Sequence, residues 1–598
     1  MNHRMNKCSI LESRRAPRRL LRRGLACFAL IFATIVEAGA PPGSAKAAPG
    51  IGESASRPRP NILVIVADDM GYSDLGSFGG EIATPRLDQL AAEGLQATRF
   101  YVGPTCSPTR AMLMSGVDNH LAGLGNMAET MGDDQRGQPG YEGYLNERVI
   151  SFAKVLGDSG YHTYFAGKWH LGVEPPQWPA ARGFERDLAM LAGGTFTYWD
   201  PMVSWLPTLD PMKFTRNGES LEQLPAGFYS TEAYTDAIID NIDEKRGDGK
   251  PFFALVSYQA PHTPLGLPED WLDRARGRYE EGYDRLRDRR LSRMKEIGLV
   301  EEDATLPESN AAPWATLSDA EKRKSARAME VYAGIIENMD FHIGRLLDSL
   351  KEMDLYEDTL VIFFSDNGAE GNDQAAYINA RMLYAFFFNL FFDNRTENLG
   401  RHLSWTEVGP GWAQVSMVPF REFKGSVAEG GIRSPLIVAG PGVRAGTKTA
   451  ELMHVMDVAP TLLQVAGTSQ PKMKEGRPVV PHQGRSWLPL LSGTRKTVRD
   501  VDGWLGFEFM DGRAIRQGDW KLLSQPRPGG DGQWRLFRLK DDPSEERDLS
   551  ATHPAKKLEL IELWGRYVRE NGVLIPDEPG RGRGRPVFHT TDTRRSDN

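Results

Sequence analysis

Cysteine is scarce in this chain. Its 598 residues include three, Cys8, Cys27 and Cys106. Cys8 and Cys27 lie in an N-terminal segment that we expect to be removed, so the mature chain keeps Cys106 alone. A single thiol cannot form an internal disulfide. The remaining roles for Cys106 are a buried apolar residue, an intermolecular bridge, a nucleophile or the precursor of another group.

Long hydrophobic runs are also missing. The apolar segments 25–36 and 383–392 are both too short to span a bilayer. For the aromatic segment 383–392 we expect a core helix or a hairpin under a lid. The alternative is an apolar wall of a binding cleft, because the segment follows an acidic motif.

The first 47 residues have the order of an export signal. Six arginines between Arg14 and Arg23 precede the apolar run, and the small residues around Lys46 offer a cleavage site. The arginine pairs permit either the Sec or the twin-arginine route. We therefore predict a signal peptide at 1–47, a periplasmic or secreted protein, and no membrane span after the signal is removed.

The chain has fewer positively charged than negatively charged side chains. Removing residues 1–47 takes nine of the 72 Lys and Arg and two of the 80 Asp and Glu, which leaves a net charge of −15. Such a chain does not bind nucleic acid through bulk charge. An anionic ligand would need a few cations placed in a pocket. The Gly- and Arg-rich segment 576–598 predicts a disordered tail.

What the chain does contain is an alternation of strand and helix patterns. Short apolar runs at 62–66, 252–256, 360–364 and 435–438 predict strands buried on both faces, and helical patterns occur at 85–92, 149–156, 231–241 and 326–350. This predicts an α/β fold with a large, mostly parallel sheet flanked by helices. The charged segment 266–324 is expected to decorate the surface.

A second pattern begins near residue 502. Alternating apolar and polar residues at 513–516, 520–523 and 534–539 predict antiparallel strands, and 557–570 predicts an amphipathic helix. We therefore expect a catalytic domain at 58–495 and a small C-terminal α+β domain with an antiparallel sheet at 496–575.

Polar residues follow three of the predicted strands. Asp68 and Asp69 come after the first, Asp366 and Asn367 after another, and His262 lies a few residues beyond a third. The carboxyl ends of parallel strands share one edge of a sheet, so these groups can meet in one crevice. Each pair alone is more often a cap or a turn. Two pairs of oxygen ligands together predict a hard cation, Ca²⁺ first and Mg²⁺ second.

Isolated cations complete the set of candidates. Arg110 lies four residues after Cys106, Lys168 and His170 stand two residues apart, and Lys424 precedes a glycine. Taken singly, each is more often a surface charge or a satisfied partner than a catalyst. Their significance depends on the motifs around them.

These motifs together resemble the sulfatase family of the alkaline phosphatase-like superfamily, and bacterial arylsulfatases most of all. The matching segments are VADDMG at 66–71, CSPTR at 106–110, YEGYLNER at 141–148, GKWHLG at 167–172, PH at 261–262, SDNGA at 365–369, Lys424 and GGIRSP at 430–435. The likeness covers nearly all of residues 59–570. Thr109 and Val117 depart from the commonest family residues. Thr109 keeps a hydroxyl and is not expected to block maturation, whereas Val117 leaves a detail of local packing open.

The resemblance implies a specific chemistry. Cys106 would be converted to formylglycine (3-oxoalanine) by a maturation enzyme, and its hydrate would attack sulfur. The modified Cys106 would hold one Ca²⁺, or Mg²⁺, together with Asp68, Asp69, Asp366 and Asn367. Arg110 and His170 would orient the hydrate, with His170 as the base that expels sulfate. Lys168 and Lys424 would bind sulfonate oxygens, and His262 would protonate the leaving alcohol or hold the sulfate.

The expected function is therefore an arylsulfatase-type hydrolase, a sulfuric ester hydrolase acting on a small sulfate ester, and we expect a monomer. Phosphate monoesters and phosphonate esters present similar tetrahedral anions, so a hydrolase of that class is one alternative. A sulfatase acting on sulfated carbohydrates is another. An inactive, calcium-stabilised carbohydrate-binding protein is a third, although binding alone would not need a formylglycine signal.

Overall fold

The computed structural model describes residues 59–194, 198–199, 212–372, 382–500, 502–526 and 530–575. The predicted signal peptide at 1–47 and the predicted tail at 576–598 lie outside these ranges. Among the described residues, no helix is both long and apolar enough to cross a membrane.

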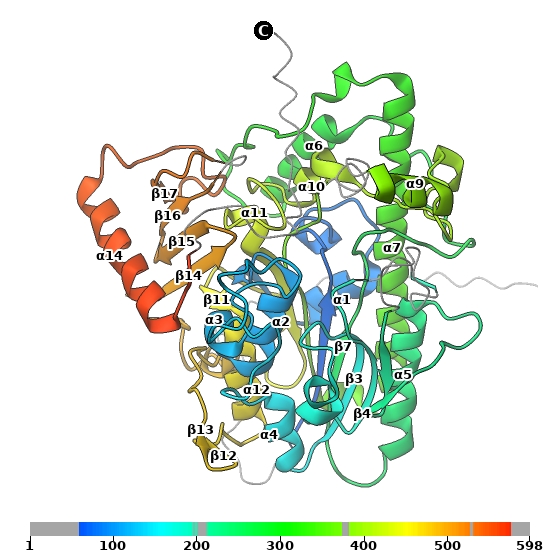
Figure 1. The fold of residues 1–598 in the computed structure, drawn as a ribbon, viewed down its shortest axis with the longest axis vertical. Helices are drawn as coiled ribbons and strands as arrows, with labels where there is room; N and C mark the ends of the chain where they lie inside the picture. Colours follow the sequence, from blue (N-terminus) through cyan, green and yellow to red (C-terminus); the bar gives the residue numbers. More distant parts are fainter. Residues whose placement is uncertain are drawn as a thin grey trace, which may run out of the picture. The chain divides into compact units, whose positions relative to one another are not determined.

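An 11-stranded sheet forms the core of the larger part of the fold (Figure 1). The strand order is β10-β2-β9-β8-β1-β7-β3-β4-β5-β6, and β11 also pairs with β2. The central strands β8, β1, β7, β3 and β4 are parallel, whereas β9 runs antiparallel to both of its neighbours. The strand bounds are β1 Asn61–Ala67, β2 Leu95–Tyr101, β3 His162–Lys168, β4 Arg186–Met190, β5 Phe214–Arg216, β6 Glu219–Ser220, β7 Phe252–Ser257, β8 Thr359–Ser365, β9 Arg433–Ala439, β10 Thr447–Thr449 and β11 Met453–His454.

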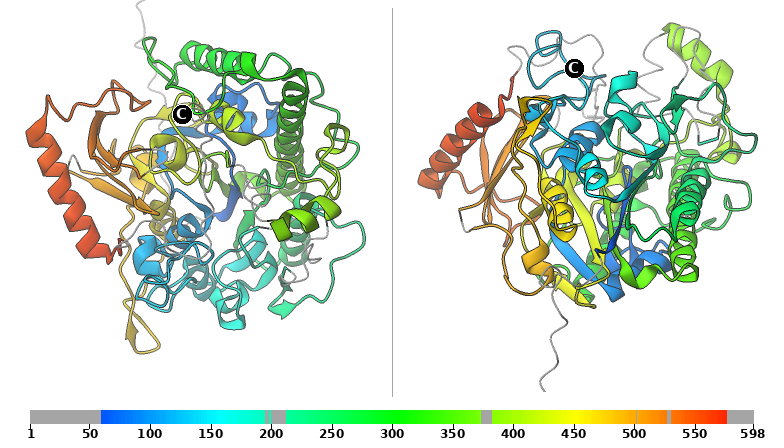
Figure 2. Two further views of the ribbon diagram at one scale, coloured as in Figure 1. Left: turned by 45° about the horizontal axis from the view of Figure 1, so that its top comes forward. Right: turned by 90° about the horizontal axis from the view of Figure 1, so that it is seen from below.

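Helices cover both faces of this sheet (Figures 1 and 2). On β1, Leu63 and Ile65 join the core beneath α1 (Pro85–Glu93), α5 (Ser230–Lys245) and α7 (Asp319–Glu352). Ile62 and Val64 join the core beneath α2 (Cys106–Ser115), α4 (Phe152–Asp158) and α12 (Val458–Val465). A strand with two buried faces needs a continuous apolar run, which is why the sequence of β1 predicts a parallel sheet.

The smaller helices lie in the connections. They are α3 (Asn119–Ala122), α6 (Tyr283–Glu296), α9 (Met382–Phe391), α10 (Gly409–Ser416), α11 (Glu429–Ile432) and α13 (Leu488–Leu491), and β12 (Met473–Lys474) pairs with β13 (Arg477–Pro478). The aromatic segment forms helix α9. Its Phe388 and Phe392 pack against Trp405, while Phe386 and Leu390 are exposed. A helix was expected here, but only one of its faces is buried.

The C-terminal part is the predicted antiparallel sheet with one helix. Strands β14 (Trp504–Phe509), β15 (Gly512–Gln517), β16 (Trp520–Ser524) and β17 (Arg535–Arg538) pair in sequence order, and α14 (Pro554–Asn571) flanks them (Figure 1). Leu505, Phe507 and Leu523 belong to the same apolar core as the helices α2 and α12. The domain boundary at 495 and 496 stays a prediction.

The expectation for segment 266–324 is wrong. Trp271, Tyr279 and Leu286 are buried in the main core. Arg290 on α6 is also buried, because its guanidinium pairs with Asp74 and Glu81. The segment looks surface-like in sequence because charged residues dominate it, whereas several of those charges are paired inside the fold.

Candidate active site

The parallel strands end in register and bring their polar residues to one edge of the sheet. Ala67 pairs with Ser365, and Val66 pairs with both Phe364 and Ser257. Asp68 and Asp69 therefore continue from β1 beside Asp366 and Asn367, which continue from β8. The backbone N–H of Asp366 donates to the Ala67 carbonyl over 3.0 Å. Asp69 has φ +68°, a left-handed conformation that is uncommon for a non-glycine residue and that turns the chain at this edge.

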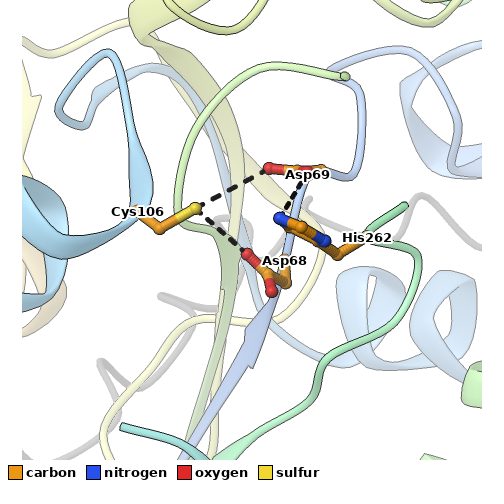
Figure 3. Close-up of side chains that lie close together, drawn as sticks. All are labelled: Asp68, Asp69, Cys106 and His262. Atoms are coloured by element: carbon orange, nitrogen blue, oxygen red, sulfur yellow. Dashed lines mark hydrogen bonds and ion pairs between the residues drawn. The ribbon is translucent and has the colours of Figure 1, made fainter. Parts of the chain in front are cut away.

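Cys106 occupies the first position of α2 and points at both aspartates. Its Sγ lies 3.4 Å from Asp68 Oδ1 and 3.9 Å from Asp69 Oδ1 (Figure 3). The side chain is 1% exposed. Burial and the negative charge of Asp366 raise the pKa of the Cys106 thiol well above its usual value. A neutral thiol is a weak nucleophile, so this environment does not suit catalysis by a thiolate.

Arg110 lies one turn further along α2 and contacts residues at the ends of strands β3, β7 and β8. Its Nε and Nη2 donate to Asp366 Oδ2 over 3.0 and 2.7 Å, and its Nη1 donates to the Lys168 carbonyl over 2.7 Å and to Ser257 Oγ. Burial and the neighbouring Asp68 carboxylate raise the pKa of Asp366, which Arg110 and Lys168 oppose. Arg110 thus fixes the orientation of the carboxylate that the sequence assigns to the metal site.

Two buried lysines face the aspartates from opposite segments. Lys168, the last residue of β3, donates to Asp68 Oδ1 and Oδ2 over 2.9 and 2.7 Å. Lys424 donates to Asp69 Oδ2 over 2.8 Å and lies 3.0 Å from Glu370 Oε2. Burial opposes the ionisation of Asp69, but Lys424 and His262 bring its pKa below the usual range. The pair supplies positive charge where an anionic ester would need it.

The two histidines of the site have opposite tautomers. His262 Nδ1 lies 2.5 Å from the Thr263 carbonyl, which can only accept a hydrogen bond, so Nδ1 carries the proton. Its Nε2 faces Asp69 Oδ2 at 3.5 Å. His170 Nε2 instead lies 3.2 and 3.4 Å from the two carboxylate oxygens of Glu129, so Nε2 carries the proton. His170 Nδ1 is buried and finds no hydrogen-bond partner among the described residues.

Sequence reasoning missed several residues of this site. Glu129 belongs to a loop without strand or helix patterning, and Glu370 lies just beyond the SDNGA motif. Gly193 and Gly194 pass so close to the histidines that a Cβ on Gly193 would stand 2.3 Å from His170 Cε1, and one on Gly194 3.1 Å from His262 Cε1. Glu129 has no local sequence signal of its own, and only the position of Gly193 and Gly194, shortly after β4, could have drawn attention to this part of the site.

The donor set fits a hard divalent cation. Ligand atoms of Asp68, Asp69, Cys106 and His262 all lie within 4.8 Å of one another. Asn367 donates through Nδ2 to Asp69 Oδ1 over 2.6 Å, while its Oδ1 is buried without a hydrogen-bond partner in the described part of the chain. A buried amide oxygen of this kind is a natural cation ligand. The structure therefore connects nine of the residues nominated from the sequence in one cluster, and His170 lies near its edge, since the adjacent Gly193 and Gly194 lie against His170 and His262. The nine are Asp68, Asp69, Cys106, Arg110, Lys168, His262, Asp366, Asn367 and Lys424.

Comparison with known proteins identifies the family. The sequence pattern described as Sulfatase matches residues 60–468, and the pattern described as N-sulphoglucosamine sulphohydrolase, C-terminal, matches residues 423–564. The chain belongs to the sulfatase family. The predicted resemblance is thus confirmed, and with it the reaction class, the hydrolysis of sulfate esters.

Named relatives and solved structures agree with this assignment. An uncharacterised sulfatase of Schizosaccharomyces pombe is 40% identical over 543 residues, which cover 88% of this chain and 96% of the relative. The arylsulfatase of Klebsiella aerogenes is 38% identical over 440 residues, which cover 73% of this chain and 93% of the relative. The crystal structure of Ps i-CgsB with k-i-k-neocarrahexaose matches with a TM-score of 0.59 at 22% identity, over 86% of this chain and 94% of that one. The predicted fold class is confirmed.

Proposed function

We propose that this sulfatase hydrolyses small aryl sulfate esters with a formylglycine made from Cys106 and one bound Ca²⁺, or Mg²⁺ as the alternative. The observation that carries the proposal is the position of Cys106 Sγ, 3.4 Å from Asp68 and 3.9 Å from Asp69, beside Arg110 of the same helix and beside Lys168 and Lys424 from two other segments. The aryl preference rests on the 38% identity to a protein named arylsulfatase.

Burial of Cys106 constrains its maturation. Because the residue is 1% exposed at the start of a fully buried helix, a modifying enzyme cannot reach it in the folded protein. The maturation enzyme must therefore act on the chain before α2 packs. Once formed and hydrated, formylglycine supplies two hydroxyl groups on one carbon, so one oxygen can attack sulfur and the other can later release sulfate.

The metal ligands proposed are Asp68, Asp69, Asp366 and Asn367, with an oxygen of residue 106. The orphaned Oδ1 of Asn367 and the convergence of the two aspartates support this set. When bound, the divalent ion supplies a fixed positive charge that stabilises negative charge developing on oxygen. Because the ion would share these carboxylates with Lys168 and Lys424, both lysines would become available to an anionic substrate.

The remaining roles follow from position and protonation. Lys168 and Lys424 bind the sulfonate oxygens as buried cations, and Arg110 keeps Asp366 and the first turn of α2 in place. His170 accepts a proton at the unprotonated Nδ1. In the neutral tautomer His262 Nε2 carries no proton, so holding a sulfonate oxygen and protonating the leaving alcohol both require the imidazolium. The proposal keeps both roles for His262.

The N-terminal segment belongs to the same proposal. We propose that residues 1–47 direct export through the Sec or twin-arginine route and that the mature protein is a periplasmic or secreted monomer. The ordered basic, apolar and small-residue regions support it. Sequencing the N-terminus of the protein recovered from the periplasm or medium tests the cleavage, and retention of the first 47 residues would contradict it.

The mass of the peptide that contains Cys106 tests the catalytic proposal. We expect an aldehyde in protein purified from its native host, and an intact thiol there would contradict the proposal. Cys106→Ser should allow at most one sulfonate transfer per molecule, since a single hydroxyl cannot expel sulfate and regenerate the starting group. Sustained turnover by that variant would also contradict it.

Two further measurements separate the alternatives. Turnover of 4-nitrophenyl sulfate should exceed that of 4-nitrophenyl phosphate, and the reverse would favour the phosphate ester hydrolase. Adding Ca²⁺ at about 100 times its Kd should stabilise the protein by roughly 2.7 kcal/mol. Asn367→Leu should weaken this shift, while Asn389→Leu, a change at an exposed position of α9, should retain it.

A further inference from the structure

Among the described residues of the site, the Glu129 carboxylate contacts His170, the proposed base, rather than a cation of the aspartate cluster. Its two oxygens lie 3.2 and 3.4 Å from His170 Nε2. The His170 side chain is 8% exposed, whereas that of Glu129 is 55% exposed. Glu129 therefore reaches from the surface loop to the buried imidazole. Partial loss of solvent around its carboxylate opposes its ionisation, but His170 lowers the pKa of Glu129 to about 2.

This contact determines which nitrogen of His170 carries the proton. A carboxylate can only accept, so the ring donates from Nε2 and presents an unprotonated Nδ1 in its neutral form. Nδ1 is buried and has no hydrogen-bond partner among the residues described. Burying such an acceptor unpaired costs free energy, and strained or unsatisfied groups of this kind occur where a site performs chemistry.

The backbone around His170 reinforces the same orientation. His170 has φ +54°, in the left-handed region, and its N–H donates to the Leu191 carbonyl over 3.1 Å. Gly193 lies against the ring, where a Cβ would stand 2.3 Å from Cε1 and 2.4 Å from Nε2. The imidazole is thus confined between a glycine and a carboxylate. A side chain at 193 would push the ring away from Glu129.

We propose that Glu129 is a positioning residue for His170, holding the Nε2–H tautomer so that Nδ1 accepts the proton during release of sulfate. This inference rests on the proposed function. In that step Nδ1 takes the proton of the free hydroxyl on residue 106, and the electrons of that O–H bond form the C=O bond. The C–O bond to sulfate breaks, and its electron pair leaves with sulfate. The Glu129 carboxylate stabilises the imidazolium that results.

Two substitutions at Glu129 distinguish the effect of its negative charge from its effect on the tautomer of His170. In Glu129→Gln the amide oxygen can still accept from Nε2–H, so the tautomer is kept and only the negative charge is lost. In Glu129→Ala both are lost. We expect kcat to fall by about 10- to 100-fold in Glu129→Gln, with a smaller change in KM, and further in Glu129→Ala. Asp133→Asn, an equal charge change at an exposed position of the same loop, should retain wild-type kcat.

Burst kinetics of Glu129→Gln identify the reaction step that Glu129 affects. Because the loss concerns release of sulfate, Glu129→Gln should liberate about one equivalent of phenol per aldehyde-bearing site in a burst, followed by slow turnover. A slow phase without a burst would place the effect on an earlier step and overturn the proposal. So would a kcat for Glu129→Gln equal to that of the wild type.

A readout independent of turnover comes from nitrogen NMR of histidine. In the Cys106→Ala protein, which carries no aldehyde, His170 should be protonated at Nε2, with the signal assigned through His170→Gln. Adding Glu129→Gln should keep that tautomer, and adding Glu129→Ala or Gly193→Ala should give a mixture. An Nδ1–H tautomer in Cys106→Ala would overturn the inference. A wild-type protein without an aldehyde would instead overturn only the proposed function.

Discussion

Two of the buried charge clusters in the described residues can be compared directly, and one of the two is the candidate site. The active-site cluster consists of Asp68, Asp69, Arg110, Lys168, Asp366 and Lys424. The interdomain cluster consists of Tyr101, Glu429, Arg433, Lys521 and Glu545, where β2, α11 and β9 meet the C-terminal part. Lys168 and Lys521 are equally inaccessible, with side chains 0% exposed. Burial of charge therefore does not distinguish the two clusters.

What differs is whether the buried polar atoms have a partner. In the interdomain cluster, the four carboxylate oxygens of Glu429 and Glu545 each lie 2.6 to 2.9 Å from a donor or a cation; Glu545 Oε1 makes no hydrogen bond but lies 2.8 Å from Lys521 Nζ. Beside the active-site cluster, Asn367 Oδ1 and His170 Nδ1 have no hydrogen-bond partner among the described residues. Positive φ does not separate the clusters, because Glu545 adopts it as Asp69 and His170 do. Polar atoms left without a partner, rather than charge, distinguish the candidate site.

The largest contrast should come from removing Lys168. We expect Lys168→Met to lower kcat/KM by about 10²- to 10³-fold, because a buried cation that faces the ester is lost. Its effect on unfolding should be milder than that of the matching change at Lys521, since Asp68 keeps Arg110 at 3.5 Å. Steady-state kinetics and urea unfolding on the same preparation check both parts. Wild-type kcat/KM in Lys168→Met would remove the distinction between the clusters.

The corresponding substitution in the interdomain cluster is Lys521→Met. Glu429 and Glu545 would lose their shared cation, and breaking a buried pair in this way costs about 3–5 kcal/mol of unfolding free energy. Activity per folded molecule should stay at the wild-type value. Lys556→Met provides the control, because Lys556 pairs with the exposed Glu559 on α14 and should cost less than about 1 kcal/mol. Equal losses at positions 521 and 556 would show that the interdomain cluster contributes little.

Sequence reasoning reached the parts of the site that follow regular elements. Asp68 and Asp366 could be placed together because each directly follows a strand with a continuous apolar run, and parallel strands end at a common edge. Cys106 and Arg110 share the first turns of one helix, so their spacing also carried information. The same reasoning gave the apolar strands of the sheet and the C-terminal antiparallel pattern, but not the order of the strands in the sheet.

The sequence could not predict that Glu129 and Gly193 belong to the site, for a physical reason. Both belong to loops, whose paths depend on long-range contacts rather than on a local period, so nothing in their neighbours indicates a meeting with His170. Segment 266–324 failed for a related reason. A buried arginine such as Arg290 looks like a surface residue until its partners Asp74 and Glu81 are known, and these lie about 200 residues away in the chain.

The smallest predicted effect concerns a second contact between the same two parts of the chain. His120 is buried between Asp118 and Glu508, at 2.7 and 3.3 Å, with the Tyr567 hydroxyl at 3.3 Å and Tyr141 against the ring. Burial opposes its protonation, but Asp118 and Glu508 raise the pKa of His120 to about 9. The unfolded chain has a pKa near 6.5, so this group stabilises the fold fully below pH 6.5 and the contribution is lost as pH rises through 9.

Between pH 6 and pH 9.5, His120 should therefore lose about 1–3 kcal/mol of stabilisation. Urea unfolding of the wild type and of His120→Gln at both values measures it, because the glutamine cannot titrate and its stability should change less over this interval. Lys521→Met leaves the contacts of His120 with Asp118 and Glu508 in place, so its stability should fall over this interval as that of the wild type does. Parallel curves for the wild type and His120→Gln would show that His120 is neutral in the folded protein, and the contact between α3 and β14 would then be held by hydrogen bonds rather than by charge.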